Sequence, residues 1–312
     1  MNELITDIKS IEIETLNNLK LSKASNTIRA YKSDFKDFAM FCTNNGFKSL
    51  PTEPKIVSLY LTYLSSVSKI STLKRRIASI SVLHRLKGHY IDTKHPIIIE
   101  NLMGIRRKKG SYQKSKKPIL LNELKEIVKA IDKINANKLY NSSISNKAVR
   151  DKAIILTGFA GGFRRSELVS ISHDDLEFVS EGVKIFIKRS KTDQSGEGMI
   201  KALPYLDNKE FCAVTFLKQW IALSEIKSGL IFNISDKSVA LLIKKYVSAA
   251  GFDANKYSGH SLRSGFATVS AEFGADERSI MNITGHKTTQ MVRRYIKEAN
   301  LFKNNALSKI KI

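Results

Sequence analysis

Apolar residues recur at helical spacing through the first hundred positions of the chain. Between residues 25 and 45 they stand three or four positions apart, which places them on one face of a helix. These positions are Ile28, Tyr31, Phe35, Phe38 and Phe41. A second helix is expected after Pro54 and a third over residues 71–88, because apolar residues keep the same period there. The N-terminal part is therefore predicted to be entirely helical.

The pattern changes in the C-terminal part, where short stretches typical of strands lie between helices. A helix is expected over residues 147–161, ended by a pair of glycines. Three short strands are predicted at Leu176 to Val179, Val183 to Ile187 and Ile200 to Leu203. Helices are expected again over residues 209–226, 237–250 and 261–273, followed by shorter ones. The predicted fold class is mostly α with a small antiparallel β-sheet (α+β).

A basic segment separates these two parts. Residues 106–117 read RRKKGSYQKSKK, with seven basic residues, no acidic residue and only Tyr112 as a large apolar group. Such a segment cannot form a packed core, so a linker is predicted. The expected domains are residues 1–105, which are helical, and 118–312, which combine helices with strands. The linker is either a solvated loop or a strap along a phosphate backbone, and its charge density favours the strap.

The composition adds a strong basic excess to this picture. The 312 residues include 52 Lys and Arg against 29 Asp and Glu, a net charge of +23. Apolar residues make up 42% of the chain, which excludes a largely disordered protein. So large an excess indicates a polyanionic partner, with nucleic acid ahead of an anionic membrane surface. The apolar runs are too short to span a bilayer.

The two cysteines, Cys42 and Cys212, lie far apart in the sequence. They exclude a disulfide framework and a multi-cysteine zinc module, and they fit a reducing compartment. The first residues lack the apolar run of a signal peptide. We therefore expect a cytoplasmic protein associated with the nucleoid, and no membrane partner.

Some of the basic residues occupy positions that a solvated helix rarely uses. Lys74, Arg75 and Arg76 lie near the start of the predicted helix over residues 71–88, where the helix dipole disfavours cations. A helix whose N-terminal end enters a DNA groove has a reason to place cations there. We predict DNA contacts for these three residues and for the start of the linker, which is Arg106, Arg107, Lys108 and Lys109.

Four segments of the C-terminal part offer groups for phosphate chemistry, in a fixed order. They are GFRRSEL with Arg164 and Glu167, a hairpin tip with Lys191, GHSLRSG with His260 and Arg263, and GHKTTQMVRRY with His286 and Tyr295. Each has an ordinary explanation when taken alone, such as a surface ion pair or a packed tyrosine. Together they supply cations around an anion, proton carriers and a nucleophile.

In identity, order and spacing, these segments resemble the tyrosine recombinases of the phage-integrase type. The resemblance extends to RDKAIILTGFAGGFRRSELVSISHDDL around Arg164 and to both helical segments of the N-terminal part, over about residues 20–300. It implies a helical core-binding domain and an integrase-type catalytic domain. Double-stranded DNA with a specific core site is the implied substrate, and strand exchange passes through a Holliday junction.

The resemblance also implies a role for each site residue. Tyr295 would attack the scissile phosphodiester and form a 3′-phosphotyrosyl bond. Arg164 and Arg263 would hold the non-bridging oxygens. Lys191 would protonate the leaving 5′ oxygen, His260 would assist proton transfer with Tyr295, and His286 would hydrogen-bond the phosphate.

Further consequences of the resemblance concern support, cofactors and assembly. Glu167 would support Arg164, and no metal or other cofactor would be needed. Lys188 and Lys201 are alternatives to Lys191 as the acid, and Arg165 leaves the first arginine doubled. The last 17 residues would form a helix donated to a neighbouring protomer in a tetramer on DNA. A partner recombinase or an accessory protein is compatible with this interpretation.

Two rival functions use similar groups or the same fold. A type IB topoisomerase would relax DNA without a specific site, whereas a recombinase requires one. A non-catalytic DNA-binding protein would keep the fold but need no nucleophile. The intact set of six candidate catalytic residues argues against the second rival.

Overall fold

The computed structural model describes residues 24–110, 115–136, 142–188 and 197–300, with isolated positions 10, 11, 13, 14, 18, 307 and 310. The candidate acid Lys191 and most of the predicted C-terminal helix therefore lie outside the described residues. The chain divides into two compact units, unit 1 (Met1–Lys114) and unit 2 (Ser115–Ile312), each described by itself below. The boundary falls inside the segment predicted to be a linker.

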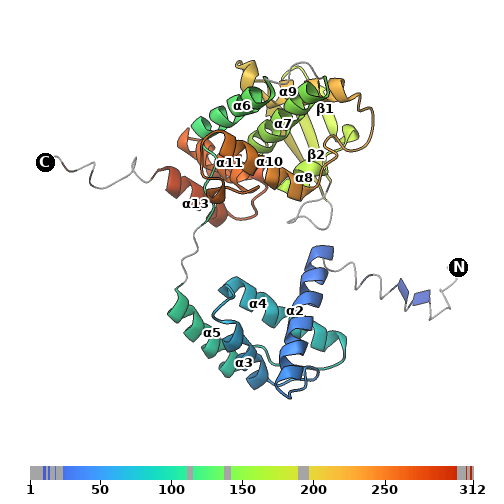
Figure 1. Ribbon diagram of the computed structural model, residues 1–312, viewed down its shortest axis with the longest axis vertical. Helices are drawn as coiled ribbons and strands as arrows, with labels where there is room; N and C mark the ends of the chain where they lie inside the picture. Colours follow the sequence, from blue (N-terminus) through green and yellow to red (C-terminus); the bar gives the residue numbers. More distant parts are fainter. Residues whose placement is uncertain are drawn as a thin grey trace. The chain divides into compact units, whose positions relative to one another are not determined.

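Unit 1 is a group of helices around one apolar core, as the sequence pattern predicts. Its helices are α2 (Ser25–Asn44), α3 (Pro54–Leu64), α4 (Ile70–Leu86) and α5 (Pro96–Lys109) (Figure 1). Phe38 of α2 and Tyr60 of α3 are fully buried, with ring centroids 5.0 Å apart. Helix α5, which the sequence pattern did not predict, begins at Pro96, a residue favoured in the first turn of a helix.

The predicted linker is wrong at its first four residues. Helix α5 continues through Lys109, and Gly110 then ends it with a φ of 71°. Ile105 is buried in the core of unit 1, which fixes this last turn. The turn carries Arg106, Arg107, Lys108 and Lys109, whose charges are favourable at the negative end of the helix dipole. A basic run is therefore compatible with a helix when it follows an apolar anchor.

Unit 2 combines a three-stranded antiparallel sheet with helices. The sheet has the order β1 (Leu176–Val179), β2 (Gly182–Ile187) and β3 (Met199–Pro204), close to the predicted strands. The helices before it are α6 (Leu121–Ala136), α7 (Ser142–Ala160) and α8 (Arg165–Val169). Those after it are α9 (Ala213–Ser224), α10 (Asp236–Ala249), α11 (Ser261–Glu272), α12 (Glu277–Thr284) and α13 (Thr289–Ala299). The predicted α+β class is confirmed.

Two helices of unit 2 form its buried centre, with the sheet beside them (Figure 1). Residues 153–156 of α7 are all buried. Helix α11 is covered on most of its surface, and a Cβ at Gly265 would lie 2.0 Å from the carbonyl oxygen of Ile119. The glycine permits this close approach. Side chains at the N-terminal ends of α8 and α11 are thereby held in a rigid frame.

Candidate active site

The site is built around the turn that joins α7 to α8. Gly162 adopts a φ of +52°, a left-handed conformation that other residues rarely take. Arg164 then caps α8. Its backbone N–H donates to Oε2 of Glu167 at 3.0 Å, and its Nη1 donates to Oε1 at 2.6 Å. Glu167 is 2% exposed, so this is a buried pair rather than a surface one. The predicted support of Arg164 by Glu167 is present.

The second arginine is fixed to the same turn. Arg263 of α11 is 1% exposed, and its Nη1 donates to the carbonyl oxygen of Gly162 at 2.8 Å. Among the described residues, its Nε and Nη2 atoms have no hydrogen-bond partner. Burial, together with the nearby charge of Arg164, lowers the pKa of Arg263 to about 10. Buried donors without a partner are rare in folded proteins, so these two lack a partner that an anion could supply.

His286 and Tyr295 lie together near the two guanidinium groups. Their ring centroids are 5.9 Å apart, and both side chains are at least partly buried. Burial, together with the charges of Arg263 and Arg164, lowers the pKa of His286 to about 3. Burial also raises the pKa of Tyr295, an effect that the charge of Arg263 opposes. At neutral pH the imidazole is uncharged and the phenol keeps its proton.

A buried threonine sets the tautomer of His286. The Thr284 hydroxyl donates to the Ile280 carbonyl oxygen at 2.6 Å, and its Oγ1 lies 2.7 Å from His286 Nδ1. A hydroxyl has one proton to donate, so Nδ1–H must be the donor in the second bond. This hydrogen-bond pattern assigns a lone pair to Nε2 of the neutral ring. Thr284, fully buried, is a site residue that sequence reasoning did not predict.

His260 is the residue immediately before α11, and its side chain is exposed. Its backbone N–H donates to Oγ of Ser258 at 3.3 Å. Its charge is close enough to help lower the pKa of His286. Five of the six predicted catalytic residues, all except Lys191, are thus described, and they gather at one end of α11.

The two alternatives to Lys191 have very different surroundings. Lys188 is 63% exposed at its side chain, and its Nζ is 2.7 Å from Oδ1 of Asp175. Lys201 is fully covered on β3, and its Nζ donates to the carbonyl oxygen of Gly161 at 2.8 Å. Neither has an ammonium group free to reach a substrate in this arrangement.

The basic residues of unit 1 divide into paired and exposed groups. Arg75 contacts Asp34 of α2 at 2.9 Å, and Arg76 contacts Asp37 and the Tyr60 hydroxyl. These ion pairs tie α4 to α2, which is a structural reason for cations at this end of α4. Lys74 and the four basic residues at the end of α5 are exposed, although Lys109 donates to the carbonyl oxygen of Ser68 at 2.8 Å. DNA contacts by all these residues stay predictions.

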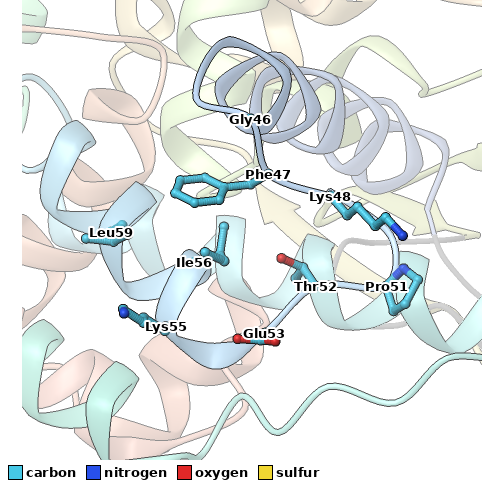
Figure 2. Close-up of a pocket in the computed structure, with 9 residues that line it drawn as sticks. All are labelled: Gly46, Phe47, Lys48, Pro51, Thr52, Glu53, Lys55, Ile56 and Leu59. Carbon is cyan, nitrogen blue, oxygen red and sulfur yellow. The ribbon is translucent and has the colours of Figure 1, made fainter.

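An open hollow in unit 1 is separate from these groups (Figure 2). It has a volume of about 640 Å³ and is lined by residues 46–59, including the apolar Phe47, Ile56 and Leu59. Lys48 and Lys55 contribute its cations. None of the predicted catalytic residues lines it.

Two further observations concern metal ions and membranes. No cluster of three or more His, Cys, Asp or Glu residues suited to a metal ion occurs among the described residues. Within the same residues, no helix has the length and apolar character needed to cross a membrane. The arrangement does provide two guanidinium groups, two imidazoles and a phenol around one location.

Comparisons with known proteins agree with this chemistry. The model of the Phage integrase family matches residues 120–301. An integrase/recombinase XerD homolog of Selenomonas ruminantium is 39% identical, over 99% of this chain and 92% of that protein. A tyrosine recombinase XerC of Syntrophus aciditrophicus is 27% identical, over 95% of this chain and 93% of that protein.

Solved structures show the same fold. The XerH site-specific recombinase bound to a palindromic difH substrate aligns with a TM-score of 0.60 at 18% identity, covering 82% of this chain and 73% of its own. A lambda integrase tetramer bound to a Holliday junction aligns with a TM-score of 0.58 at 16% identity, covering 93% and 75%. From the family match and the relatives, we conclude that this chain belongs to the phage integrase family and is a tyrosine recombinase of the Xer type, an enzyme that breaks and rejoins DNA.

Proposed function

We propose that this recombinase exchanges DNA strands at a specific core site, with Tyr295 as its nucleophile and Arg164 and Arg263 as its phosphate clamp. The observation that carries the proposal is the pair of buried donors on Arg263 without a partner, beside a second guanidinium and a phenol. Fixed donors of this kind stabilise charge that develops on a phosphoryl group, and they need no rearrangement when the reaction occurs.

The chemical step transfers a phosphoryl group from the DNA to the enzyme. The Tyr295 oxygen attacks the phosphorus, the bond to the 5′ oxygen breaks, and a 3′-phosphotyrosyl bond replaces it. Lys191 gives the leaving 5′ oxygen its proton. Attack by the 5′ hydroxyl of a partner strand reverses the step, so that no external energy source is consumed. Two such exchanges form and then resolve a Holliday junction.

The two histidines accept the proton that Tyr295 loses when it attacks. His260 assists its removal from Tyr295, and the lone pair on Nε2 of neutral His286 offers a second acceptor nearby. Once Nε2 carries a proton, it becomes a donor to a non-bridging phosphate oxygen. The negative charge of a bound phosphodiester favours that protonated form. This order of events reconciles the low pKa of His286 with its proposed hydrogen bond to phosphate.

The active assembly is a homotetramer on two DNA duplexes, in which the residues after α13 pack on a neighbouring protomer. The related lambda integrase was solved as a tetramer on a Holliday junction, which supports this arrangement. Lys74 and the basic end of α5 bind the DNA backbone, so affinity falls steeply with salt. The reaction takes place in the cytoplasm on nucleoid DNA, which two buried free thiols support.

A suicide substrate tests the nucleophile. The DNA around the gene is first sequenced for inverted repeats as candidate core sites. Duplexes containing these flanking repeats, nicked near the cleavage point, should trap a covalent protein–DNA adduct with the wild type. Tyr295→Phe should form no adduct, whereas Tyr205→Phe, at an exposed position of unit 2, should form as much as the wild type. An adduct that persists in Tyr295→Phe would show that another residue attacks.

The same assay separates the two rivals. A type IB topoisomerase would relax a supercoiled plasmid that lacks the flanking repeats, and a non-catalytic DNA-binding protein would shift the duplex without forming an adduct. The proposal predicts adducts that depend on the repeats.

A further inference from the structure

One lysine in unit 2 is buried without a role in the chemistry described so far. The side chain of Lys201 on β3 is 0% exposed. Its Nζ donates to the Gly161 carbonyl oxygen at 2.8 Å, lies 3.8 Å from Oε2 of Glu167, and sits 4.3 Å from the centre of the Phe163 ring. All three contacts are to residues 161–167, the turn and the helix that carry Arg164.

Burial of an ammonium group is costly unless its charge is balanced. Burial is the largest of the effects that lower the pKa of Lys201 to about 7, and Glu167 opposes this shift. The charges of Arg263 from α11 and Arg164 from the turn contribute to the same lowering. Lys201 is therefore a cation that the fold tolerates only because Glu167 and a carbonyl oxygen receive it. The free-energy cost of burying this ammonium group indicates that Lys201 has a function in the site.

The geometry argues against Lys201 as the general acid. A general acid must come within hydrogen-bond reach of the oxygen that it protonates. The Lys201 side chain is fully covered, and its ammonium group is directed at the Gly161 carbonyl oxygen. Phe163 and the buried Glu167 also lie against it, on the side of the protein interior.

We propose that Lys201 is a positioning residue for the phosphate clamp, an inference that rests on the proposed function of the same site. Its ammonium group holds the Gly161 carbonyl and balances the second oxygen of Glu167. The neighbouring Gly162 carbonyl then receives Arg263, and Glu167 orients Arg164. One buried cation on the sheet thus fixes the positions of both guanidinium groups relative to each other.

This role makes cleavage depend on the protonation of Lys201. Deprotonation removes one of the cations that balance the buried Glu167 carboxylate and weakens the hold on Gly161. The protonated form is the active one, so this contribution is complete at low pH and is lost as pH rises through the pKa of the lysine. A phosphodiester in the site adds negative charge and favours the protonated form.

The test compares Lys201→Met with Lys184→Met in the full chain. Lys184 is on the adjacent strand β2 and pairs with the exposed Glu177, so its loss should not change cleavage. Single-turnover cleavage of the nicked duplex is measured from pH 6 to 9. Lys201→Met should cleave about 10- to 100-fold more slowly at pH 6, because small misplacement of a reacting group can cost about 10²-fold. The deficit should shrink as pH rises above about 7. DNA affinity should change less than the cleavage rate.

A second variant covers the event that Lys201→Met does not fold. Lys201→Gln keeps a donor for the Gly161 carbonyl but no charge, and its deficit relative to the wild type should also shrink as pH rises. Fluorescence of Trp220, the only tryptophan of the chain, checks folding of unit 2.

The outcomes separate this inference from the proposed function. No adduct with the wild type on the repeats would contradict the proposed function. A wild-type adduct with equal cleavage rates and pH profiles for Lys201→Met and Lys184→Met would overturn the positioning role alone. A folded Lys201→Met or Lys201→Gln whose deficit relative to the wild type is the same at every pH would overturn it as well.

Discussion

Arg263 and Gly162, 101 residues apart in the sequence, are joined by a hydrogen bond of 2.8 Å from Nη1 to the glycine carbonyl oxygen. The bond uses one side of the guanidinium group and leaves Nε and Nη2 for an anion. Because Arg164 follows Gly162 by two residues, a single turn determines where both guanidinium groups lie. The position of the clamp therefore depends on the conformation of a glycine.

Replacement of Arg263 by lysine should abolish most of the cleavage activity. A lysine keeps the positive charge, but its single nitrogen cannot hold the Gly162 carbonyl and present two further donors in a fixed plane. We expect cleavage to fall by about 10²- to 10³-fold, the usual cost of losing a fixed donor to the transition state. Single-turnover cleavage measures this loss. Arg278→Lys, at an exposed position of α12, should keep full activity, and equal rates for both variants would contradict the clamp.

Replacement of Gly162 by alanine should disturb the same turn. A Cβ there would lie 3.0 Å from Cγ2 of Thr284 and 3.1 Å from Cδ1 of Phe266, at a φ of +52°. The left-handed conformation alone costs about 1–2 kcal/mol for a residue with a Cβ. The free energy of unfolding should fall by at least that amount, and cleavage should fall with it.

Gly274→Ala is the matched control for this prediction. Gly274 has a φ of +88° and nothing within 4 Å of an added Cβ, so the variant carries backbone strain without crowding. Urea unfolding followed by Trp220 fluorescence gives the stability of both variants. Gly274→Ala should be destabilised and still cleave DNA. Loss of cleavage in Gly274→Ala as well would show that destabilisation alone explains the effect.

The sequence predicted most of unit 2 because its signals are local. Apolar periods located the helices, and alternation located strands within one or two residues of β1 to β3. The residues around α11 could be predicted because they stand in short motifs whose order and spacing can be read directly from the sequence. Residue 191 lies outside the described residues, so the predicted acid stays a prediction.

The sequence could not indicate interactions that depend on tertiary partners. On β3, hydropathy places Ile200 inside and Lys201 outside, but Ile200 is 62% exposed and Lys201 is 1% exposed. The reversal occurs because Lys201 contacts Glu167 and the Gly161 carbonyl oxygen on the inner face of the strand. Both partners are distant from it in the sequence. The pairing of Arg75 with Asp34 could not be predicted either, because these two residues are also distant in the sequence.

Replacement of Thr284 by valine should allow both neutral tautomers of His286 to form. The hydroxyl that accepts from Nδ1–H would be lost with almost no change in shape. A hydrogen bond of this kind contributes about 0.5–1.5 kcal/mol, so we expect cleavage to slow by about 3- to 10-fold. Nitrogen-15 NMR of the imidazole should show a mixture of tautomers in place of Nδ1–H.

Thr268→Val provides the control for that change. Thr268 of α11 is also buried, and its hydroxyl oxygen has no hydrogen-bond partner among the described residues. Its removal should leave both the His286 tautomer and the cleavage rate unchanged. A Thr284→Val variant with a pure Nδ1–H ring and the wild-type rate would show that Thr284 does not position the histidine.

Unit 1 should lose stability in mild acid through His84. This ring is fully buried, with Nδ1 2.8 Å from the Ile80 carbonyl oxygen and Nε2 accepting from the Thr52 N–H at 3.1 Å. Protonation would place a hydrogen on Nε2, where it would face the N–H of Thr52. Burial lowers the pKa of His84 below its ordinary value of 6.5. The unfolded chain therefore binds the proton first. Stability contributed by the neutral ring is complete above pH 6.5 and is lost as pH falls below it, by at most about 1.4 kcal/mol per pH unit.

Hydrogen exchange of α4 peptides in the full chain, corrected for the intrinsic pH dependence of exchange, measures this effect. Between pH 6.5 and 5 the wild type should lose protection in α4. His84→Gln should be less stable at pH 7.5 but should show a smaller loss over the same interval, because its side chain does not titrate. His89→Gln, at an exposed position just after α4, should keep the loss of protection, reduced only to the extent that the charge of His89 helps to lower the pKa of His84. If His84→Gln and the wild type lost protection in parallel, the acid sensitivity of unit 1 would have to come from other groups, such as the carboxylates that pair with Arg75 and Arg76.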